Sequence, residues 1–384
     1  MKHAPLAVIA LTLAAAGCNQ NATSKSGQST PASTTPASTS PVASPVSTTP
    51  PPPPPPSTSG PPWRTSLLNV FAAALAVDPV TPSVVYAATD QGVQKTTDAG
   101  ATWKSTGLTA LSVALAIDPM TPATIFAGTA SGVSRSMDGG ASWTSVFPAA
   151  NVHALAIDPR TPANVYVGGD AGALAKSTDR GATWSTPATG IPDPIVSIAI
   201  DPTSPATLYL ATARPGPQPR QISNTGPGGL WKSTDGGATW TDLRNGLADM
   251  WNAVVVDPHA PGTLYAATDL VFNAATGASD GLVAKSIDAG ATWTQLSSFP
   301  SGSVQGLVLD PVTAGTVYTF GLGGVMKSTD AGSTWQDAGD GLVPSSFGGI
   351  PVVTALAIDA QAPLTLYASS DFFYGIEKTT TGGQ

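Results

Sequence analysis

The sequence predicts an all-β chain that forms a single seven-bladed β-propeller, with four antiparallel strands in each blade. Three observations support this prediction. A segment of the form S-x-D-x-G-x-T-W occurs six times, a short apolar strand ending in Asp occurs seven times, and both recur about every 40 to 55 residues. Repeats of this length are typical of solenoids and propellers. Seven repeats of four short strands describe a closed propeller.

The first 17 residues are predicted to be a lipoprotein signal peptide. A polar start precedes an apolar run over 6–13, which is shorter than a transmembrane helix needs. The run is followed by Ala15-Ala16-Gly17-Cys18, similar to a bacterial lipoprotein cleavage box, and Cys18 is the only cysteine. We expect lipidation of Cys18; the alternative is an ordinary signal peptide followed by a chance cysteine. By resemblance to known sorting rules, Asn19 favours the outer membrane, facing the periplasm or the cell surface.

Residues 18–62 are predicted to be a disordered tether rich in Ser, Thr and Pro. This segment has no apolar pattern that could build a core. Seven consecutive prolines at 50–56 favour an extended spacer. A binding role for this proline run is the alternative.

The repeats begin at Trp63, and each contains the same sequence of strand signals. A first strand alternates small and large apolar residues and ends at an Asp-Pro turn, except that Ala follows the last Asp. Eight residues after each such Asp, a second strand carries an aromatic residue: Tyr86, Phe126, Tyr166, Tyr209, Tyr265, Tyr318 and Tyr367. A third strand ends in a basic residue: Lys95, Arg135, Lys176, Lys232, Lys285, Lys327 and Lys378.

The S-x-D-x-G-x-T-W segment, called the box below, is predicted to be a tight turn into the fourth strand. Its Asp can accept backbone N–H bonds inside the turn, and its Gly can adopt a backbone angle that other residues resist. Its Trp opens the next strand and buries a large ring. The structural box residues are Asp98, Asp138, Asp179, Asp235, Asp288 and Asp330.

The two ends of the repeat region are predicted to share one blade. Trp63 precedes Asp78 by 15 residues, as Trp103 precedes Asp118, while the last repeat stops before its own Trp. The strand that starts at Trp63 should therefore complete the seventh blade and remove a free sheet edge. This defines one propeller domain over 63–384.

The composition argues against several classes of function. The net charge is −8 and the isoelectric point about 4.6, which makes nucleic acid an unsuitable partner. After the signal segment, His153 and His259 are the two histidines, too few for a zinc site. Neither a G-x-S-x-G nucleophile motif nor a second cysteine is present. We expect no metal and no cofactor.

The box resembles the Asp-box, or BNR repeat, of sialidases, sortilin ectodomains, xyloglucanases and photosystem II assembly-factor-like proteins, here on a bacterial lipoprotein. The resemblance covers 63–384 and implies a propeller fold rather than an activity. The arginine triad and the Arg-Ile-Pro-like segment of sialidases have no match here. Xyloglucanase-like hydrolysis requires two carboxylates and, in that family, a cleft between two propellers, whereas one propeller is expected here.

Differences in length between repeats point to a binding face. The strand 2–3 spacing is 23 residues from Tyr209 to Lys232 and 20 from Tyr265 to Lys285, against nine in the short repeats. These loops and the blade-to-blade links share one face of an up-and-down propeller, and loops on rigid scaffolds carry function. The candidate binding residues are Asp90, Asp170, Asp269, Asp371, Trp251, Arg214, Arg220 and Phe272. The alternative for each Asp is that it caps a local turn.

These observations favour a membrane-tethered, extracytoplasmic propeller that acts as a non-catalytic binding or assembly scaffold for protein or glycan. The alternative is a glycoside hydrolase of sialidase-like or xyloglucanase-like type.

Overall fold

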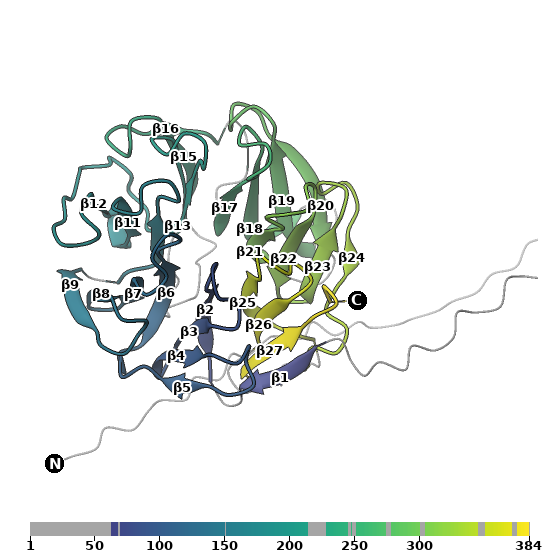
Figure 1. The fold of residues 1–384 in the computed structure, drawn as a ribbon. Coiled ribbons are helices and arrows are strands. Elements are labelled where there is room, and N and C mark those ends of the chain that lie inside the picture. Colours follow the sequence, from purple (N-terminus) through teal and green to yellow (C-terminus); the bar gives the residue numbers. More distant parts are fainter. Residues whose placement is uncertain are drawn as a thin grey trace, which may run out of the picture. The chain divides into compact units, whose positions relative to one another are not determined.

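A computed structural model confirms the seven-bladed propeller (Figure 1). It describes residues 63–67, 70–149, 151–213, 228–244, 247, 251–273, 278–299, 304–344, 350–370 and 375–383; the side chains at 67, 269–273, 278–280 and 297–299 are not described. Ser57–Gln384 forms one compact unit, separate from Met1–Pro56. No helix among the described residues has the length and apolar character needed to span a bilayer.

Blades 1 to 4 follow one another along the chain. Their strands are β2 (Ala72–Val77), β3 (Val85–Thr89), β4 (Gly92–Thr96) and β5 (Lys104–Ser105); β6 (Ser112–Ile117), β7 (Ile125–Thr129), β8 (Gly132–Ser136) and β9 (Thr144–Pro148); β10 (Ala154–Ile157), β11 (Val165–Gly168) and β12 (Leu174–Ser177), with the short 3-10 helix η1 (Asp170–Gly172); and β13 (Ile195–Ile200), β14 (Leu208–Thr212), β15 (Gly229–Ser233) and β16 (Thr241–Asp242).

Blades 5 to 7 complete the ring. Their strands are β17 (Ala253–Val256), β18 (Leu264–Asn273), β19 (Ala278–Ser286) and β20 (Thr294–Phe299); β21 (Val304–Leu309), β22 (Val317–Gly321), β23 (Gly324–Ser328) and β24 (Gln336–Asp337); and β25 (Val353–Ile358), β26 (Leu366–Ser370), β27 (Gly375–Thr379) and β1 (Arg64–Leu67). The first strands of neighbouring blades contact one another and are innermost.

The predicted ring closure is confirmed. Strand β1 pairs antiparallel with β27, with Arg64 opposite Lys378. Trp63 is 1% exposed and packs against blade 6, where its indole N–H donates to the Ala338 carbonyl at 2.8 Å. The N-terminal strand therefore covers the edge that β27 would otherwise expose.

Two elements differ from the predicted repeat. Blade 3 has three strands, and its fourth is reduced to one bridge between Lys176 and Ser185. Pro187 follows that bridge closely, and proline has no N–H to extend a ladder. In blade 5, the long strand 2–3 connection predicted between Tyr265 and Lys285 is largely a hairpin, because β18 and β19 continue past the usual blade edge.

The core lies between the blades rather than within any one sheet. Tyr86 and Val93 of blade 1 pack with Ile125 and Ala127 of blade 2, and Trp143 closes that cluster. The box tryptophans thus join neighbouring blades, as their ring size suggests.

The tryptophan indoles show how this joining works. Trp103 donates to Ser66 Oγ at 2.9 Å, and Trp143 donates to Thr106 Oγ1 at 3.1 Å. Each acceptor is the third residue after the tryptophan of the preceding blade, as is Ala338 for Trp63. At that position, the blades that precede Trp240 and Trp293 carry Pro187 and Leu243. These two buried indole N–H groups have no hydrogen-bond acceptor among the described residues.

The basic residues of the third strands also link blades. Lys95 Nζ donates to the Gly139 carbonyl of the next box at 2.7 Å and lies over the Tyr86 ring. Lys176 and Lys378 make the same contact with the next box, at 2.9 and 3.0 Å. The aromatic and basic repeat positions therefore join neighbouring blades.

Candidate functional site

The face that carries the strand 2–3 loops and the blade-to-blade links is the predicted binding face and is called the loop face. The opposite face carries the strand 1–2 turns and the boxes and is called the box face. In the innermost strands, the first residue lies toward the loop face and the Asp at the end lies toward the box face. Residues near the start of an innermost strand can therefore meet residues of the strand 2–3 loops.

Asp170 of the loop face lies in such a group, with His153 and Asn151. Its Oδ1 lies 2.6 Å from His153 Nε2, and its Oδ2 accepts a bond from Asn151 Nδ2 at 2.7 Å. The side chains of His153 and Asp170 are 22% and 39% exposed, so both reach solvent. Asn151 has a φ of 47°, a left-handed conformation that asparagine tolerates better than most residues.

The charge state of Asp170 follows from these contacts. Burial raises the pKa of Asp170, but the hydrogen bonds from His153 and Asn151 outweigh it, so this pKa lies below its ordinary value. An ionised carboxylate that holds an imidazole in one orientation can position a polar ligand or assist a proton transfer.

Strand register explains why these residues meet. In blade 3, Ala154 pairs with Gly168 across β10 and β11, so His153 and Asp170 flank the same end of the hairpin. The sequence alone did not predict that His153 and Asp170 form a pair. The spacing from the Asp that ends each first strand to the aromatic residue of the second strand is always eight residues. This constant spacing fixes which residues pair, so the register could have been extended from the sequence to His153 and Asp170.

Asp90 occupies the equivalent loop of blade 1 and is exposed. Its Oδ1 accepts the Phe71 N–H at 3.4 Å, and its own N–H donates to the Phe71 carbonyl at 3.1 Å. Asp90 thus fastens its loop to the segment before β2, the local role that was the alternative to ligand binding.

Trp251 is not on the surface, and its assignment to the binding face needs correction. It is 0% exposed and packs in the core of blades 4 and 5, 6.3 Å from the Trp293 ring. The link that carries it turns the indole inward, because burying so large a ring is strongly favourable.

The remaining candidates are described in part or lie outside the described residues. Asp269 and Phe272 belong to β18, where Phe272 pairs with Ser279 through the backbone, so both extend the hairpin. Arg214, Arg220, Asp371 and Cys18 lie outside the described residues.

Glu377, the only glutamate of the chain, is fully buried in β27. Burial raises its pKa, although its carboxylate also accepts the Val343 N–H at 3.2 Å. This contact holds the link after blade 6 against blade 7. A group so enclosed cannot reach a ligand and has a structural role.

The boxes form turns, as predicted. Asp235 accepts the N–H groups of Ala238 and Thr239 at 3.0 and 2.9 Å, and Ser233 Oγ accepts the buried Gly237 N–H at 2.9 Å. The serine therefore satisfies the buried donor, and the Asp satisfies the exposed ones. Gly237 has a φ of 92° and lies close to Leu174, as the prediction for this glycine requires.

Within the described residues, no group of three or more His, Cys, Asp or Glu side chains is arranged to hold a metal ion. Of the predicted loop-face carboxylates, Asp90 and Asp170 are described with their side chains, and each is bonded to groups of its own blade.

Comparison with known proteins places this geometry among other propellers. No protein-family model matches the chain. A probable oligoxyloglucan-reducing end-specific xyloglucanase of Neosartorya fischeri is 32% identical over 155 residues, which is 36% of this chain and 17% of that protein. The curated relatives matched are all xyloglucanases, and the chain spans only 17% to 26% of their lengths.

Solved structures share the fold over most of the chain. A GH74 enzyme of Niastella koreensis superposes with a TM-score of 0.58 at 20% identity, covering 82% of this chain and 58% of that one. YCF48 bound to D1 peptide superposes with a TM-score of 0.57 at 14% identity, covering 83% of this chain and 97% of that one. The chain thus shares its β-propeller fold with GH74 xyloglucanases and with YCF48.

Proposed function

We propose that the protein is a tethered binding module whose loop face holds a polypeptide or glycan without cleaving it. The observation that carries the proposal is the His153–Asp170 pair, a solvent-reaching imidazole and carboxylate at the loop face, 2.6 Å apart. Such a pair can donate to and accept from amide or hydroxyl groups. The superposition on 97% of YCF48, which was solved with a peptide bound, supports a single propeller that acts by binding.

Asp90 and Asp170, the two predicted carboxylates whose side chains are described, favour binding over hydrolysis. Glycoside hydrolysis uses two carboxyl groups about 5 to 10 Å apart on either side of the bond. Asp90 and Asp170 belong to blades 1 and 3, and Ala130 occupies the equivalent loop position of blade 2 between them. Each carboxylate is bonded within its own blade.

Xyloglucan hydrolysis is the second candidate, favoured by the names of the curated relatives. One experiment separates the two. The propeller unit 57–384 is incubated with xyloglucan oligosaccharides and with a peptide library, and both binding and release of reducing ends are measured. We expect retained ligand and no released ends.

Two variants test the site itself. His153→Ala and Asp170→Asn should weaken binding about tenfold, the effect of removing one or two polar contacts. Arg160→Gln is the matched control, because Arg160 is exposed on the box face of the same blade. If the parent releases reducing ends and Asp90→Asn abolishes that release, the protein is a hydrolase instead.

We also propose that Cys18 carries the lipid anchor and that the propeller is held at the bacterial outer membrane, facing the periplasm or the cell surface. The small residues before Cys18 and the polar segment after it support this proposal. Metabolic labelling with a fatty acid should mark the wild-type chain and leave Cys18→Ser unlabelled. Equal labelling of both chains would overturn it.

A further inference from the structure

The box face exposes large apolar side chains on four consecutive blades. They lie in the turns between the first and second strands and are 55% to 61% exposed: Val312, Leu364, Val80 and Met120 of blades 6, 7, 1 and 2. Gln361 Nε2 donates to the carbonyls of Pro79 and Val80 at 2.9 and 3.1 Å, so the turns of blades 7 and 1 are joined. At the position of Val80, blades 3 to 5 carry Arg160, Thr203 and His259, and blade 7 carries Gln361. Ile287 in the box of blade 5 is 75% exposed, so the apolar side chains of the box face are not confined to these four turns. The four turns follow one another round the ring and form an apolar arc, and an exposed apolar patch marks an interaction surface.

Paired cations lie in the same arc. Lys95 is directly opposite Lys104 in blade 1, and Arg64 is directly opposite Lys378 in blade 7. Like charges that face each other across a sheet are destabilising. In the other five blades, the residue opposite the basic one is uncharged: Thr144, Ser185, Thr241, Thr294 and Gln336. The two neighbouring blades thus keep charge pairs that the rest of the ring avoids.

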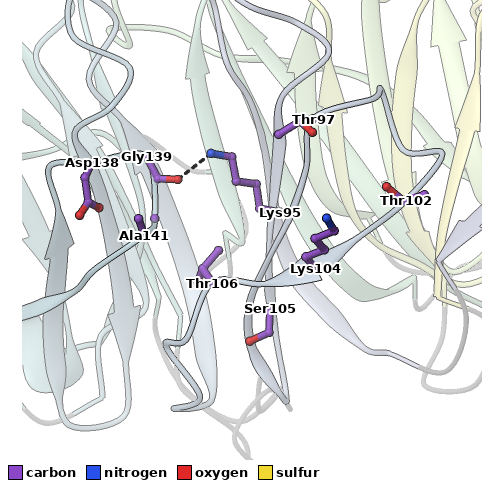
Figure 2. Close-up of a pocket in the computed structure, with 10 residues that line it drawn as sticks. Lys95, Thr97, Thr102, Lys104, Ser105, Thr106, Asp138, Gly139 and Ala141 are labelled. Atoms are coloured by element: carbon purple, nitrogen blue, oxygen red, sulfur yellow. Dashed lines mark hydrogen bonds between the residues drawn. The ribbon is translucent and has the colours of Figure 1, made fainter.

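The pair in blade 1 lines a pocket of about 200 Å³ between blades 1 and 2 (Figure 2). Hydroxyl groups from the box of blade 1 and from β5 surround it, and Asp138 to Ala141 of the next box close its other side. Figure 2 shows the Lys95 amine directed at the Gly139 carbonyl, a bond of 2.7 Å that uses one of its three N–H donors. Lys104 is exposed and lies on the neighbouring strand.

The carboxylate of this pocket is already engaged. Asp138 accepts the Ser142 N–H at 2.8 Å and the hydroxyl groups of Ser142 and Ser136 at 2.5 and 2.8 Å. These bonds lower the pKa of Asp138 to about 2, so it stays ionised, but its oxygens are directed into its own box. The hydroxyl groups of Thr102 and Thr106 are also engaged, with Asp98 and with the Val93 carbonyl. The Lys95 and Lys104 ammonium groups and the hydroxyl groups of Thr97 and Ser105 remain, a set of donors suited to the oxygens of a phosphate group. The volume suits one phosphate-bearing headgroup rather than a larger ligand.

The chain joins the propeller at this same place. Strand β1 runs antiparallel to β27, which ends at the box face, so Trp63 and Arg64 lie at the box-face end of β1. The 62 residues that precede Trp63 in the sequence therefore connect to the propeller at the box face of blade 7. The lipid anchor proposed at Cys18 is therefore connected to the box face and not to the loop face.

We propose that the box face of blades 6, 7, 1 and 2 docks on a phospholipid bilayer. The four apolar turn side chains enter the headgroup region, and the Lys95–Lys104 pocket takes the phosphate of an anionic headgroup. The loop face then points away from the membrane, which leaves it accessible to its ligand. This inference goes beyond the proposed function. Its orientation argument rests on the proposed lipid anchor, whereas the docking surface and the ligand site lie on opposite faces and are tested separately.

Vesicle flotation with the propeller unit 57–384 tests the proposal. This unit lacks Cys18, so any binding reports the face and not the lipid anchor. We expect it to float with vesicles of phosphatidylcholine and phosphatidylglycerol, and less with phosphatidylcholine alone. Lys104→Ser should lower the partition coefficient about fivefold, the effect of one basic residue at a membrane surface. Val80→Ser combined with Met120→Ser should lower it about tenfold or more.

Two control variants make the result specific. Leu111→Ser removes an exposed apolar side chain on the loop face, and Arg160→Ser removes an exposed cation from the polar arc of the box face. Both should float like the parent. The proposal fails if the parent unit does not bind the anionic vesicles, or if the control variants lose binding as much as the arc variants. It also fails if free inorganic phosphate binds as tightly as the vesicles, because no bilayer is then required. Loss of ligand binding at the loop face would leave this result unaffected.

Discussion

Replacing Trp63 tests whether the N-terminal strand holds the ring closed. Trp63 is 1% exposed and packs with Tyr318, Val325 and Leu342 of blade 6. A buried tryptophan removes about 150–250 Å² from water, which at about 25 cal/mol per Å² corresponds to roughly 4–6 kcal/mol. This agrees with the usual cost of Trp→Ala, about 3–5 kcal/mol. At roughly 2–4 °C per kcal/mol for a domain of this size, Trp63→Ala should lower Tm by about 10 °C.

The hydrogen bond of Trp63 can be measured separately. Trp63→Phe keeps most of the ring but leaves the Ala338 carbonyl without its indole donor, which should cost about 1–3 kcal/mol more than the change in ring size. Trp240→Phe is the matched control, since its buried indole N–H has no hydrogen-bond acceptor among the described residues. Urea unfolding followed by circular dichroism measures both. The closure argument is wrong if Trp63→Ala leaves the midpoint within experimental error, and the hydrogen-bond argument is wrong if the two Phe variants lose equal stability.

Three further predictions follow from burial and from the pKa values. Trp251→Ala should destabilise the propeller by about 3–5 kcal/mol because the side chain is buried, and thermal melting checks this; an unchanged Tm would place Trp251 back on the surface. The boxes should lose stability as the pH falls from about 4 to about 2. Hydrogen bonds, first from the Thr or Ser hydroxyl and then from the backbone N–H, stabilise the ionised box carboxylate in the folded state. They lower its pKa to about 2 at Asp98, Asp138, Asp179, Asp288 and Asp330. Asp98→Asn should make acid unfolding, followed by tryptophan fluorescence, less steep, whereas an unchanged curve would contradict this assignment. At alkaline pH, the tyrosines of the second strands should behave in the opposite way. Burial, and then a nearby Asp, raise the pKa of their phenol groups to about 12, so the folded state favours the protonated phenol. These residues are Tyr86, Tyr166, Tyr209, Tyr265, Tyr318 and Tyr367. The stability that these phenols contribute is complete below pH 10 and is lost as the pH rises toward 12. Absorbance titration should therefore show tyrosine ionisation well above pH 10, together with unfolding. Ionisation near pH 10 with the fold intact would refute this prediction.

Local spacing allowed most of the fold to be predicted. The eight residues from each Asp to its aromatic set a tight strand 1–2 turn in every blade, where Asp78 accepts the N–H groups of Val80 and Thr81. The same regularity placed Trp63 in the seventh blade. Blade 3 departs from the pattern because Pro187 interrupts its fourth strand. The blade 5 insertion became a hairpin because its two arms pair with each other.

The candidate site could be predicted only in part. The loop face followed from the lengths of the connections, and Asp170 followed from its place four residues after the strand 2 aromatic. Its partner His153 lies just before the preceding strand and meets Asp170 only through the register of the hairpin. Trp251 was misplaced because position in a link does not determine the direction of a side chain. Its burial depends on the space between β14, β15 and β18, which belong to two different blades.

The sequence by itself determined the number of blades, the strand order and the closure of the ring, because turns and two-residue strand periodicity depend on residues close together in the chain. Only the tertiary structure decided what happens between blades. Trp143 and its acceptor Thr106 are 37 residues apart in the chain, and the turns of Val80 and Gln361 are about 280 residues apart. Whether such a contact forms depends on the side chain that another repeat places at that position. The apolar arc and the cation pairs of the box face arise in the same way. Each repeat contributes one side chain, and the ring brings the contributions of the first and last repeats together.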